Sequence, residues 1–378
     1  MKSQSSKFNN QTSSSHPKVA IVHDWLYGGG AEKVVQALHE MYPTAPIYTS
    51  YCTPQWQNKL NNKVITGYLN KWPFSKLRKF IPFLRIWWFQ SLDLTKYDLI
   101  ISSSGAEAKG VKKLNKNALH VNYCHAPTHY YWSRYEEYLK EPGFGIFNPI
   151  ARLGLKILVG PLRKWDYKAA QRPDYIIANS TNIQQQIKKY YNRESTVIHP
   201  PVNVVNFLPK NNLANKSGLV ITGRQVPYKR IDIAVKAAIA ANEHISVIGN
   251  GPLHNEIVKI AKDSQYVTFY TNMSDTDLVS SLQNAKLFIF PGVEDFGIAP
   301  VEALAAGTAV IAYKKGGSLD YVNSNNGIFV ENQSTKDFAQ AIKTGLNKKW
   351  NHNEISKSAD QFSVENFKQN ITNFLNSI

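Results

Sequence analysis

Residues 287–306 read Leu-Phe-Ile-Phe-Pro-Gly-Val-Glu-Asp-Phe-Gly-Ile-Ala-Pro-Val-Glu-Ala-Leu-Ala-Ala, a short apolar run followed by a loop and a helical pattern. A fully apolar run of this length is typical of a strand buried inside a parallel sheet. Proline is favoured at the first helical position, so we expect Pro300 to open the helix and Gly297, Ile298 and Ala299 to present backbone N–H groups at its positive end. Such a helix start binds phosphate.

Two carboxylates accompany this helix start. We expect Glu302 in the first helical turn and Glu294 in the preceding loop, so that both can face one cleft, where carboxylates suit the hydroxyl groups of a sugar. Taken alone, Glu302 could simply complement the helix dipole and Glu294 could be solvated. The neighbouring motifs favour the binding role.

The alternation of apolar runs with helical stretches recurs along the chain, which predicts parallel sheets covered by helices. In the first half the expected strands are 18–23, 46–51, 99–103, 119–124 and 175–179, with helices at 31–41 and 181–191. After Pro200 and Pro201 the pattern restarts, with strands at 218–222, 245–248, 267–270, 287–290 and 309–312 and a helix at 231–241. We therefore expect an α/β protein with two doubly wound, Rossmann-like domains that face each other across a cleft.

The expected organisation has four parts. Residues 1–17 are polar and are expected to form a disordered tail, residues 18–203 a first domain and residues 204–360 a second domain. Residues 361–378 hold a final helix whose apolar positions fall on one face. The adjacent prolines mark the hinge between the two domains.

A basic motif, Gly223-Arg224-Gln-Val-Pro-Tyr-Lys229-Arg230, follows the first expected strand of the second domain. Open α/β sheets place ligands at this end of their strands, so Arg224 and Lys229 are candidate clamps for a diphosphate, although such a pair is otherwise usually surface charge. Two cations held in a dry cleft stabilise a departing nucleoside diphosphate without a divalent metal. Asp275 and Asp277 resemble a metal-binding pair but open an expected helix and are better explained as its cap, so we expect no metal site.

Two features of the first domain point to the same cleft. Gly28, Gly29 and Gly30 follow its first strand and precede a helix, so the backbone can approach a donor phosphate or sugar closely, although a tight turn explains three glycines equally well. His125 ends an apolar strand, where it can support a sugar or serve only as a structural hydrogen bonder. The G-x-G-x-x-G spacing is missing, which argues against a hydride-transfer enzyme.

The charge of the chain is concentrated in its first half. The net charge is +17; residues 1–200 hold 27 Lys and Arg against 12 Asp and Glu, and the remainder holds 17 against 15, so the excess is +15 in the first part and +2 in the second. This asymmetry predicts a polyanionic partner, either an anionic lipid surface or nucleic acid. With two cysteines, no secretory signal and no apolar run long enough to span a membrane, we expect a cytoplasmic protein without disulfides.

The segment 67–92 has a composition typical of a membrane interface, because aromatic rings suit the headgroup region and Lys and Arg attract anionic lipid. The residues expected to contact the membrane are Lys71, Trp72, Lys76, Arg78, Lys79, Arg85, Trp87 and Trp88. A second basic and apolar stretch, 151–168, is expected to assist. Alternatively, the aromatic residues are core beside solvated cations, or the segment binds nucleic acid by stacking bases beside a basic groove. A nucleic-acid-binding module would need none of the motifs between residues 223 and 302.

The Glu294 to Glu302 spacing, the 223–229 segment, the glycine loop and the strand-end His125 together resemble retaining glycosyltransferase family four of the GT-B fold, over nearly all of residues 18–348. The sequences Val-His-Asp-Trp and Tyr-Cys-His-Ala-Pro resemble its bacterial mannosyltransferase-like branch, which builds lipopolysaccharide or O-antigen chains. The resemblance implies transfer of a hexose, with mannose and GDP-mannose favoured over UDP-sugars, to a lipid-linked or polysaccharide acceptor. It also implies a peripheral location on the inner face of the cytoplasmic membrane. The alternative is an enzyme of the same family with a soluble acceptor.

The resemblance also implies residue roles. The catalytic set would be His125 beside the 6-hydroxyl of the sugar, Arg224 and Lys229 on the donor diphosphate, and Glu294 on the transferred sugar. Glu302 would hold the ribose hydroxyls. Further donor contacts are implied for the glycine loop and for Gly223, Gly249, Gly251, Met273, Phe296, Gly297, Ile298 and Ala299.

The resemblance further implies that the first domain binds the acceptor, the second binds the nucleotide sugar and the final helix packs back on the first domain. No residue obviously provides a carboxylate nucleophile beneath the anomeric carbon, so the donor phosphate would act as the base on one face of the sugar. The chain departs from the branch at His129, where an arginine is often found, which puts a phosphate or acceptor contact in doubt.

Overall fold

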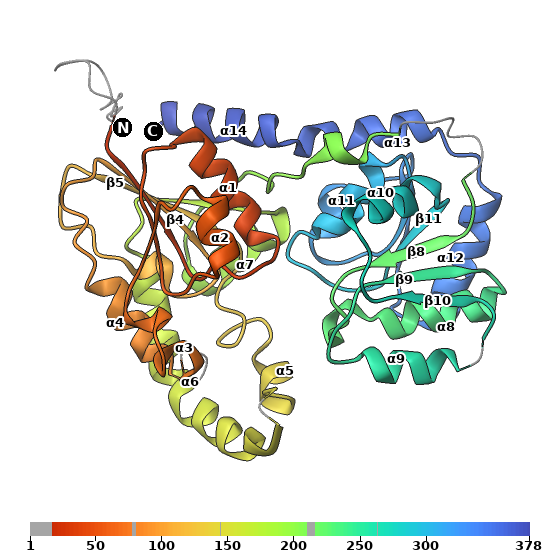
Figure 1. Cartoon of the computed structure of the whole chain (residues 1–378), viewed down its shortest axis with the longest axis horizontal. Coiled ribbons are helices and arrows are strands. Elements are labelled where there is room, and N and C mark those ends of the chain that lie inside the picture. The colour runs from red at the N-terminus through yellow and green to blue at the C-terminus, as the bar shows by residue number, and fades with distance from the viewer. Residues whose placement is uncertain (1–16, 78–80, 144, 210–215, 263) are drawn as a thin grey trace. The chain divides into compact units, whose positions relative to one another are not determined.

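The computed structural model describes residues 17–77, 81–143, 145–209, 216–262 and 264–378. The chain divides into two compact units, here called the first unit (residues up to His199 together with Lys368–Ile378) and the second unit (Pro200–Phe367). Each holds one parallel sheet flanked by helices, which confirms the prediction of two Rossmann-like folds (Figure 1). The predicted membrane contacts Arg78 and Lys79, and the predicted tail apart from Pro17, lie outside the described residues.

The sheet of the first unit has seven parallel strands in the order β3-β2-β1-β4-β5-β6-β7. Its strands are β1 (Val19–His23), β2 (Ile47–Thr49), β3 (Val64–Thr66), β4 (Leu99–Ser104), β5 (Leu119–Cys124), β6 (Tyr175–Ala178) and β7 (Thr196–Val197). Its α-helices are α1 (Ala31–Met41), α2 (Pro54–Lys59), α3 (Phe74–Leu77), α4 (Pro82–Gln90), α5 (Tyr135–Lys140), α6 (Asn148–Ala170) and α7 (Thr181–Tyr191). Every residue of β1 and β4 is buried, as expected for the central strands of a parallel sheet covered on both faces.

The sheet of the second unit has six parallel strands in the order β10-β9-β8-β11-β12-β13. Its strands are β8 (Leu219–Thr222), β9 (Ile245–Ile248), β10 (Val267–Tyr270), β11 (Leu287–Phe290), β12 (Ala309–Tyr313) and β13 (Gly327–Val330). Its α-helices are α8 (Ile231–Ala241), α9 (His254–Ala261), α10 (Asp275–Asn284), α11 (Ile298–Ala305), α12 (Thr335–Asn347) and α13 (His352–Ser358). Both sheets reverse their strand order once, between β1 and β4 in the first unit and between β8 and β11 in the second. In such sheets this reversal is where ligands bind.

The final helix α14 runs from Val364 to Asn376, and its residues from Lys368 onward group with the first unit. Lys368 forms an ion pair with Glu40 of α1 at 2.7 Å, and Phe374 packs edge-on against Tyr175. These contacts fix the last part of the helix to the first unit.

Local sequence explains where several helices begin. The hydroxyls of Ser180, Ser274 and Ser334 each accept a hydrogen bond from the backbone N–H three residues later, the standard N-cap arrangement. The prediction that Asp275 and Asp277 cap their helix was therefore wrong in detail. Ser274 is the cap, and the two aspartates lie in the first turn, where negative charge complements the helix dipole.

Part of the segment predicted to face a membrane is core. Arg85 is 5% exposed because its guanidinium pairs with the buried carboxylate of Glu107, at 2.9 Å from Nε and 2.7 Å from Nη2. Trp88 is 5% exposed and packs edge-on against Phe89. These two residues therefore do not contact a membrane. Trp72 and Trp87, at 78% and 62% exposed, do reach the surface.

None of the helices in the described ranges is both long enough and apolar enough to cross a membrane. α6 is the longest of those given above, but Arg and Lys side chains occur along it. On its outer side Ile150, Leu153 and Ile157 are 60–70% exposed.

Candidate active site

The centre of the candidate site in the second unit is an ion pair between the loops that follow β8 and β11. Lys229 ends the short 3-10 turn Pro227–Lys229, and its Nζ lies 2.6 Å from Oε1 of Glu294. The two side chains are 15% and 19% exposed. Burial opposes the positive charge of Lys229, but the carboxylates of Glu294 and, more weakly, Glu302 outweigh it and hold the pKa of the ammonium group above its usual value. The site therefore keeps a charged lysine in a mostly dry position.

Glycine makes this close approach possible. Gly223 has a φ of +133°, and a Cβ at this position would lie 2.9 Å from Nζ of Lys229. A Cβ on Gly292 would lie 2.8 Å from Cα of Lys229. A larger residue at Gly292 would push apart the two loops that hold the ion pair, whereas one at Gly223 would displace the end of the Lys229 side chain.

The helix after β11 begins earlier than predicted. Gly297, with a φ of +90°, is the N-cap, Ile298 is the first helical residue and Pro300 is the third. Proline is tolerated there because the first N–H groups of a helix have no acceptor within it. Glu302 consequently lies in the second turn and not in the first, but it remains close enough to Lys229 to act on its charge.

The side chain of Phe296 is buried, so only its backbone is available to a ligand. Its ring is 3% exposed and packs edge-on against Tyr321, whose hydroxyl donates to the carbonyl of Phe296 at 3.0 Å. A Cβ on Gly317, in the turn after β12, would lie 2.3 Å from Cα of Phe296. The turn after β12 thus supports the loop of Glu294 from behind, a contact that we did not predict.

The loops after β9 and β10 complete this edge of the sheet. Gly249, with a φ of +120°, and Gly251 pack against the backbone of the β8 loop, where a Cβ on either would come within 2.6 Å of Gly223 or Gln225. The buried side chain of Gln225 joins these loops: it donates to the carbonyl of Gly249 at 2.8 Å and contacts Nδ1 of His254 at 2.9 Å. Sequence reasoning missed Gln225, although it lies inside the predicted basic motif. Met273 follows β10 and is partly buried against the core.

Arg224 differs from the other cations of this region. Its side chain is exposed, and among the described residues no carboxylate lies within ion-pairing distance. Arg230 instead pairs with Asp232 at 3.0 Å and donates to Gln333 at 3.2 Å. Arg224 is therefore placed to meet an anion, whereas Arg230 is committed to the structure of its own loop.

In the first unit, the glycine loop precedes α1 as predicted, but a carboxylate already holds part of it. Oε1 of Glu32 accepts hydrogen bonds from the N–H groups of Gly28 at 3.0 Å and Tyr27 at 3.4 Å. Glu32 is 4% exposed, whereas Gly28, Gly29 and Gly30 are exposed. The open part of the loop is thus its second half, next to the positive end of α1.

His125 follows β5 and lies beside the point where the strand order reverses. Its Nε2 is 2.7 Å from Oγ of Ser103, at the end of β4. The loop after β4 is held by Asp24, whose carboxylate accepts from the N–H groups of Gly105, Ala106 and Ala108 at 2.7–2.9 Å. Burial, together with the charge of Glu107, raises the pKa of Asp24. The sequence did not reveal Asp24 as a loop anchor, although it directly follows the first strand.

The predicted site residues thus form two groups, one in each unit. Gly223, Arg224, Lys229, Glu294 and Glu302 come together in the second unit, with the loops of Gly249, Gly251 and 296–299 beside them. The glycine loop and His125 lie at the corresponding edge of the first sheet. His129 contacts Ser133 at 2.9 Å. The described ranges contain no group of three or more His, Cys, Asp or Glu arranged to hold a metal ion.

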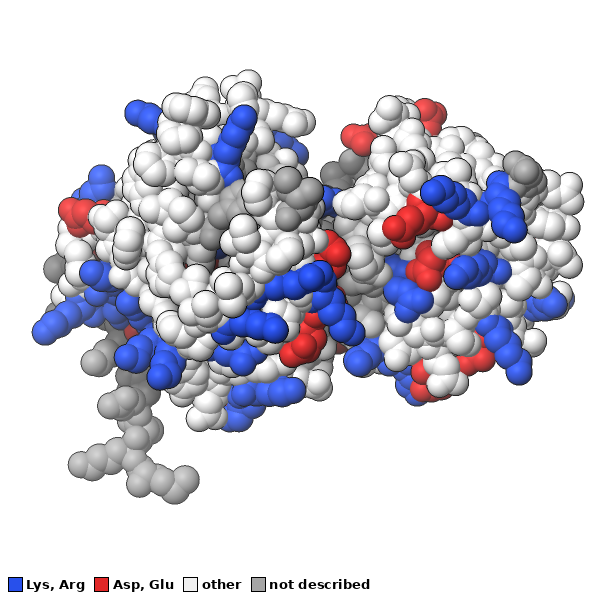
Figure 2. Space-filling model, turned by 90° about the horizontal axis from the view of Figure 1, so that it is seen from below, with Lys and Arg blue, Asp and Glu red and all other residues white. Residues whose placement is uncertain are grey.

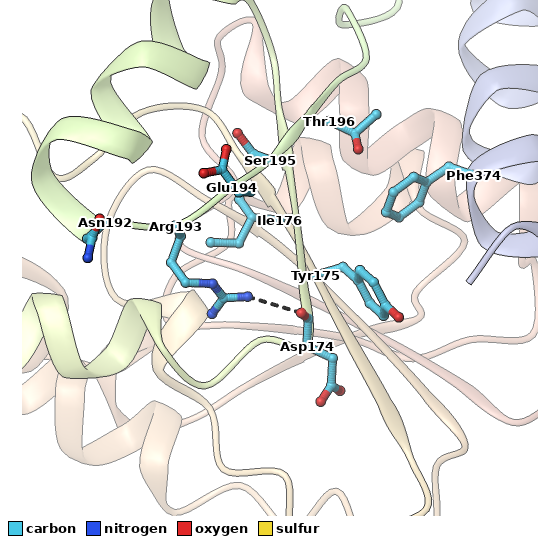
Figure 3. A pocket seen from close by; sticks show the side chains of 9 residues that line it. All are labelled: Asp174, Tyr175, Ile176, Asn192, Arg193, Glu194, Ser195, Thr196 and Phe374. Carbon is cyan, nitrogen blue, oxygen red and sulfur yellow. Dashed lines mark hydrogen bonds between the residues drawn. The ribbon is translucent and has the colours of Figure 1, made fainter. Parts of the chain in front are cut away.

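A separate pocket of about 380 Å³ lies elsewhere in the first unit (Figure 3). It is formed where β6 and β7 begin, and Tyr175, Thr196 and Phe374 are among the residues that line it. Arg193 donates to the carbonyl of Asp174 at 3.0 Å. The pocket contains none of the predicted site residues. It lies at the amino-terminal ends of the strands, whereas His125 lies at their carboxyl ends.

The two halves of the chain match two known family models. Residues 28–205 match the model described as Glycosyltransferase Family 4, and residues 206–362 match the model described as Glycosyl transferases group 1. The chain is 23% identical over 430 residues to the alpha-1,3/1,6-mannosyltransferase ALG2 of Dictyostelium discoideum, with 95% of this chain and 98% of the relative covered. It is 28% identical over 212 residues to a D-inositol 3-phosphate glycosyltransferase of Mycobacterium sp. (strain KMS), a match that spans 50% of this chain and 48% of that relative.

Solved structures show the same fold. HepE of Anabaena in complex with UDP superposes with a TM-score of 0.71 at 18% identity, covering 96% of this chain and all of that one. WaaG, a glycosyltransferase involved in lipopolysaccharide biosynthesis, superposes with a TM-score of 0.68 at 15% identity, covering 94% and 99%. The two family matches adjoin and together span the two units, so the chain belongs to the glycosyltransferases of the GT-B fold, with a family 4 first half and a group 1 second half.

Proposed function

We propose that the chain is a retaining, metal-independent hexosyltransferase that moves mannose from a nucleotide diphosphate sugar to a lipid-linked or polysaccharide acceptor. The observation that carries the proposal is the ion pair of Lys229 and Glu294 at the reversal of the second sheet. It places one cation and one carboxylate where an open α/β sheet binds its ligand.

The ion pair suits the two halves of such a donor. As the bond to the sugar breaks, negative charge grows on the diphosphate, and Lys229 with the exposed Arg224 would stabilise it. Glu294 has no hydrogen-bond partner for Oε2 among the described residues, so this oxygen can accept from a sugar hydroxyl. Two protein cations would supply the charge that a divalent metal supplies in other transferases.

Mannose as the transferred sugar is supported by the similarity to a mannosyltransferase along nearly the whole chain. HepE, which is similar in fold alone, has been solved with UDP and with UDP-glucose. We favour GDP-mannose as the donor. Its nucleobase can be identified by measuring the melting temperature of the protein with GDP, UDP and ADP in turn. A rise with GDP above the other two supports the proposal, and a rise with none of them contradicts it.

We further propose that transfer takes place at an anionic membrane surface, on the inner face of the cytoplasmic membrane. Lys71, Trp72 and Lys76 on and beside α3, and Trp87 on α4, are exposed. α4 and α6 pack together through Ile86 and Leu162, and α3, α4 and α6 lie at one end of the first unit (Figure 1). Aromatic rings and aliphatic side chains beside basic residues suit the interface of an anionic bilayer.

The apolar–basic patch, defined as Lys71, Trp72, Lys76, Trp87, Ile150, Leu153, Lys156 and Ile157, therefore replaces the set predicted from the sequence. Figure 2 views the molecule from below and shows Lys and Arg side chains around a broad area without charge on the left-hand unit. The alternative is a soluble acceptor, and it is favoured if anionic vesicles at low salt do not bind the protein. Binding of nucleic acid in place of vesicles would favour the least supported reading, a nucleic-acid-binding role for the first unit.

A further inference from the structure

His125 belongs to a chain of hydrogen bonds that spans three neighbouring strands. His23 ends β1, Ser103 lies near the end of β4, and His125 directly follows β5. Oγ of Ser103 lies 2.7 Å from Nε2 of His125 and 3.2 Å from Nδ1 of His23. The two imidazole rings are 6.0 Å apart at an angle of 86°, with the serine between them. The hydrogen bonds therefore run along the carboxyl end of the sheet, where ligands bind, from the buried His23 to the partly exposed His125.

The direction of these hydrogen bonds follows from one atom that can only accept. Nδ1 of His23 lies 2.8 Å from the backbone carbonyl oxygen of Ser103, so this nitrogen must carry a proton. Since His23 is the donor on this side, Oγ of Ser103 can only accept from it. Oγ of Ser103 has no other hydrogen-bond partner among the described residues, so its hydroxyl proton is directed to Nε2 of His125, which accepts. The single proton of a neutral His125 then resides on Nδ1.

Burial makes the arrangement rigid. Ser103 is fully buried and His23 is 3% exposed, whereas His125 is partly exposed. A buried hydroxyl with a histidine on each side has few other rotamers that satisfy both.

We propose that Ser103, oriented by His23, is a positioning residue that holds His125 as the tautomer protonated at Nδ1. His125 then approaches the donor sugar as a hydrogen-bond donor to a hydroxyl oxygen. The inference rests on the proposed function, because it gives His125 a role toward a sugar, but the tautomer itself can be measured without substrate.

The chain offers a matched control one residue away. Ser102 points to the other face of the sheet, where its Oγ lies 2.8 Å from Nε2 of His120 and donates to Oδ1 of Asn122 at 3.1 Å. Because that hydroxyl proton goes to Asn122, His120 donates through Nε2, the opposite tautomer to the one assigned to His125. His120 is fully buried and does not reach the edge of the sheet.

The test is ¹⁵N NMR of the histidine side chains in the full-length protein at neutral pH, beside sugar-transfer kinetics. In the wild type we expect Nδ1 of His125 to be protonated. Ser103→Ala should shift His125 towards the Nε2-protonated form and lower kcat by about 10- to 100-fold, by analogy with the loss of partners that orient metal-bound histidines. KM for the donor should change little. Ser103→Thr, which keeps the hydroxyl, should retain both the Nδ1-protonated form of His125 and the wild-type kcat. Ser102→Ala should alter neither the His125 signal nor kcat.

Protonation of Nε2 of His125 in the wild type would overturn the inference, whatever the kinetics. A Ser103→Ala variant that folds and keeps both the tautomer and the rate would also overturn it. If Ser103→Ala does not fold, the wild-type spectrum decides alone. Absence of any sugar transfer by the wild type would contradict the proposed function and leave the tautomer measurement intact.

Discussion

The ammonium nitrogen of Lys229 lies 2.6 Å from a carboxylate oxygen of Glu294, across the point where the second sheet reverses its strand order. The two residues are distant in sequence but follow neighbouring strands, so the topology of the sheet brings them together. Glycine on both loops permits the contact, and the buried position keeps water from weakening it.

We predict that Lys229→Ala lowers the rate of sugar transfer on the order of 10²- to 10³-fold, because the charge that would stabilise the departing diphosphate is lost. The melting temperature should also fall, since Glu294 is left mostly buried without its partner. The measurement is nucleoside diphosphate release together with thermal unfolding. Lys314→Ala is the matched control. Lys314 pairs with Glu331 at 2.7 Å, but these two side chains are 47% and 69% exposed, so the substitution should leave the rate unchanged. Wild-type activity in folded Lys229→Ala would exclude the assigned role.

Arg85 is predicted to stabilise the fold and not to bind lipid. Arg85→Ala leaves the carboxylate of Glu107 buried without a countercharge, which should lower the free energy of unfolding by about 3–5 kcal/mol. Denaturant unfolding measures this, and Lys71→Ala, at an exposed position, should change it by less than about 1 kcal/mol. If Arg85→Ala were as stable as the wild type but bound vesicles more weakly, Arg85 would contact the membrane and the prediction would be wrong.

Vesicle binding should depend on the apolar–basic patch. Leu153→Ser with Ile157→Ser should weaken binding to anionic vesicles, because two exposed apolar side chains would no longer be buried in the interface. Lys71→Gln and Lys76→Gln should each cost about 1 kcal/mol of binding at low salt and less at high salt. Flotation with anionic and with neutral vesicles separates the two contributions. Val258→Ser, at an exposed helical position of the second unit, is the control that should bind as the wild type does.

Stability should fall in mild acid because of His120. Burial lowers the pKa of His120 from 6.5 to about 3, so between these values the unfolded chain binds a proton that the folded chain does not. The free energy of unfolding should therefore decrease as the pH falls from about 6.5 towards 3, by up to about 1.4 kcal/mol per pH unit from this group. Denaturant unfolding across this range should show a shallower dependence for His120→Gln. His244→Gln, at an exposed site, should keep the wild-type slope.

Much of the fold could be predicted because buried parallel strands have continuous apolar sequences. β5, β9, β10 and β11 were predicted with the bounds they have, as were the helices α1, α7 and α8. The edge strands β3 and β7 were missed, because each has only two or three residues and shows no periodicity. The long helix α6 was recognised only as a basic and apolar stretch, since Gly154, Gly160 and Pro161 interrupt its helical pattern.

Parts of the candidate site could be predicted wherever a residue directly follows a strand that is recognisable in the sequence. The positions of Lys229, Glu294 and His125 at strand ends followed from the alternation of apolar runs and loops. The tertiary partners did not, because composition cannot tell which residue of an aromatic and basic run faces inward. Arg85 is buried by a carboxylate 22 positions along the chain, and Ser103 reaches His125 only through the register of β4 and β5.

The central claim is tested most directly by following GDP-[¹³C]mannose with the purified protein, an acceptor extract in anionic vesicles and EDTA. We predict release of GDP in step with the appearance of acceptor-bound mannose, with the α-configuration of the donor retained in the NMR spectrum of the product. Strong inhibition by EDTA would contradict metal independence, and a β-linked product would contradict retention. If GDP-mannose and UDP-sugars all remain intact, the chain is not the transferase described.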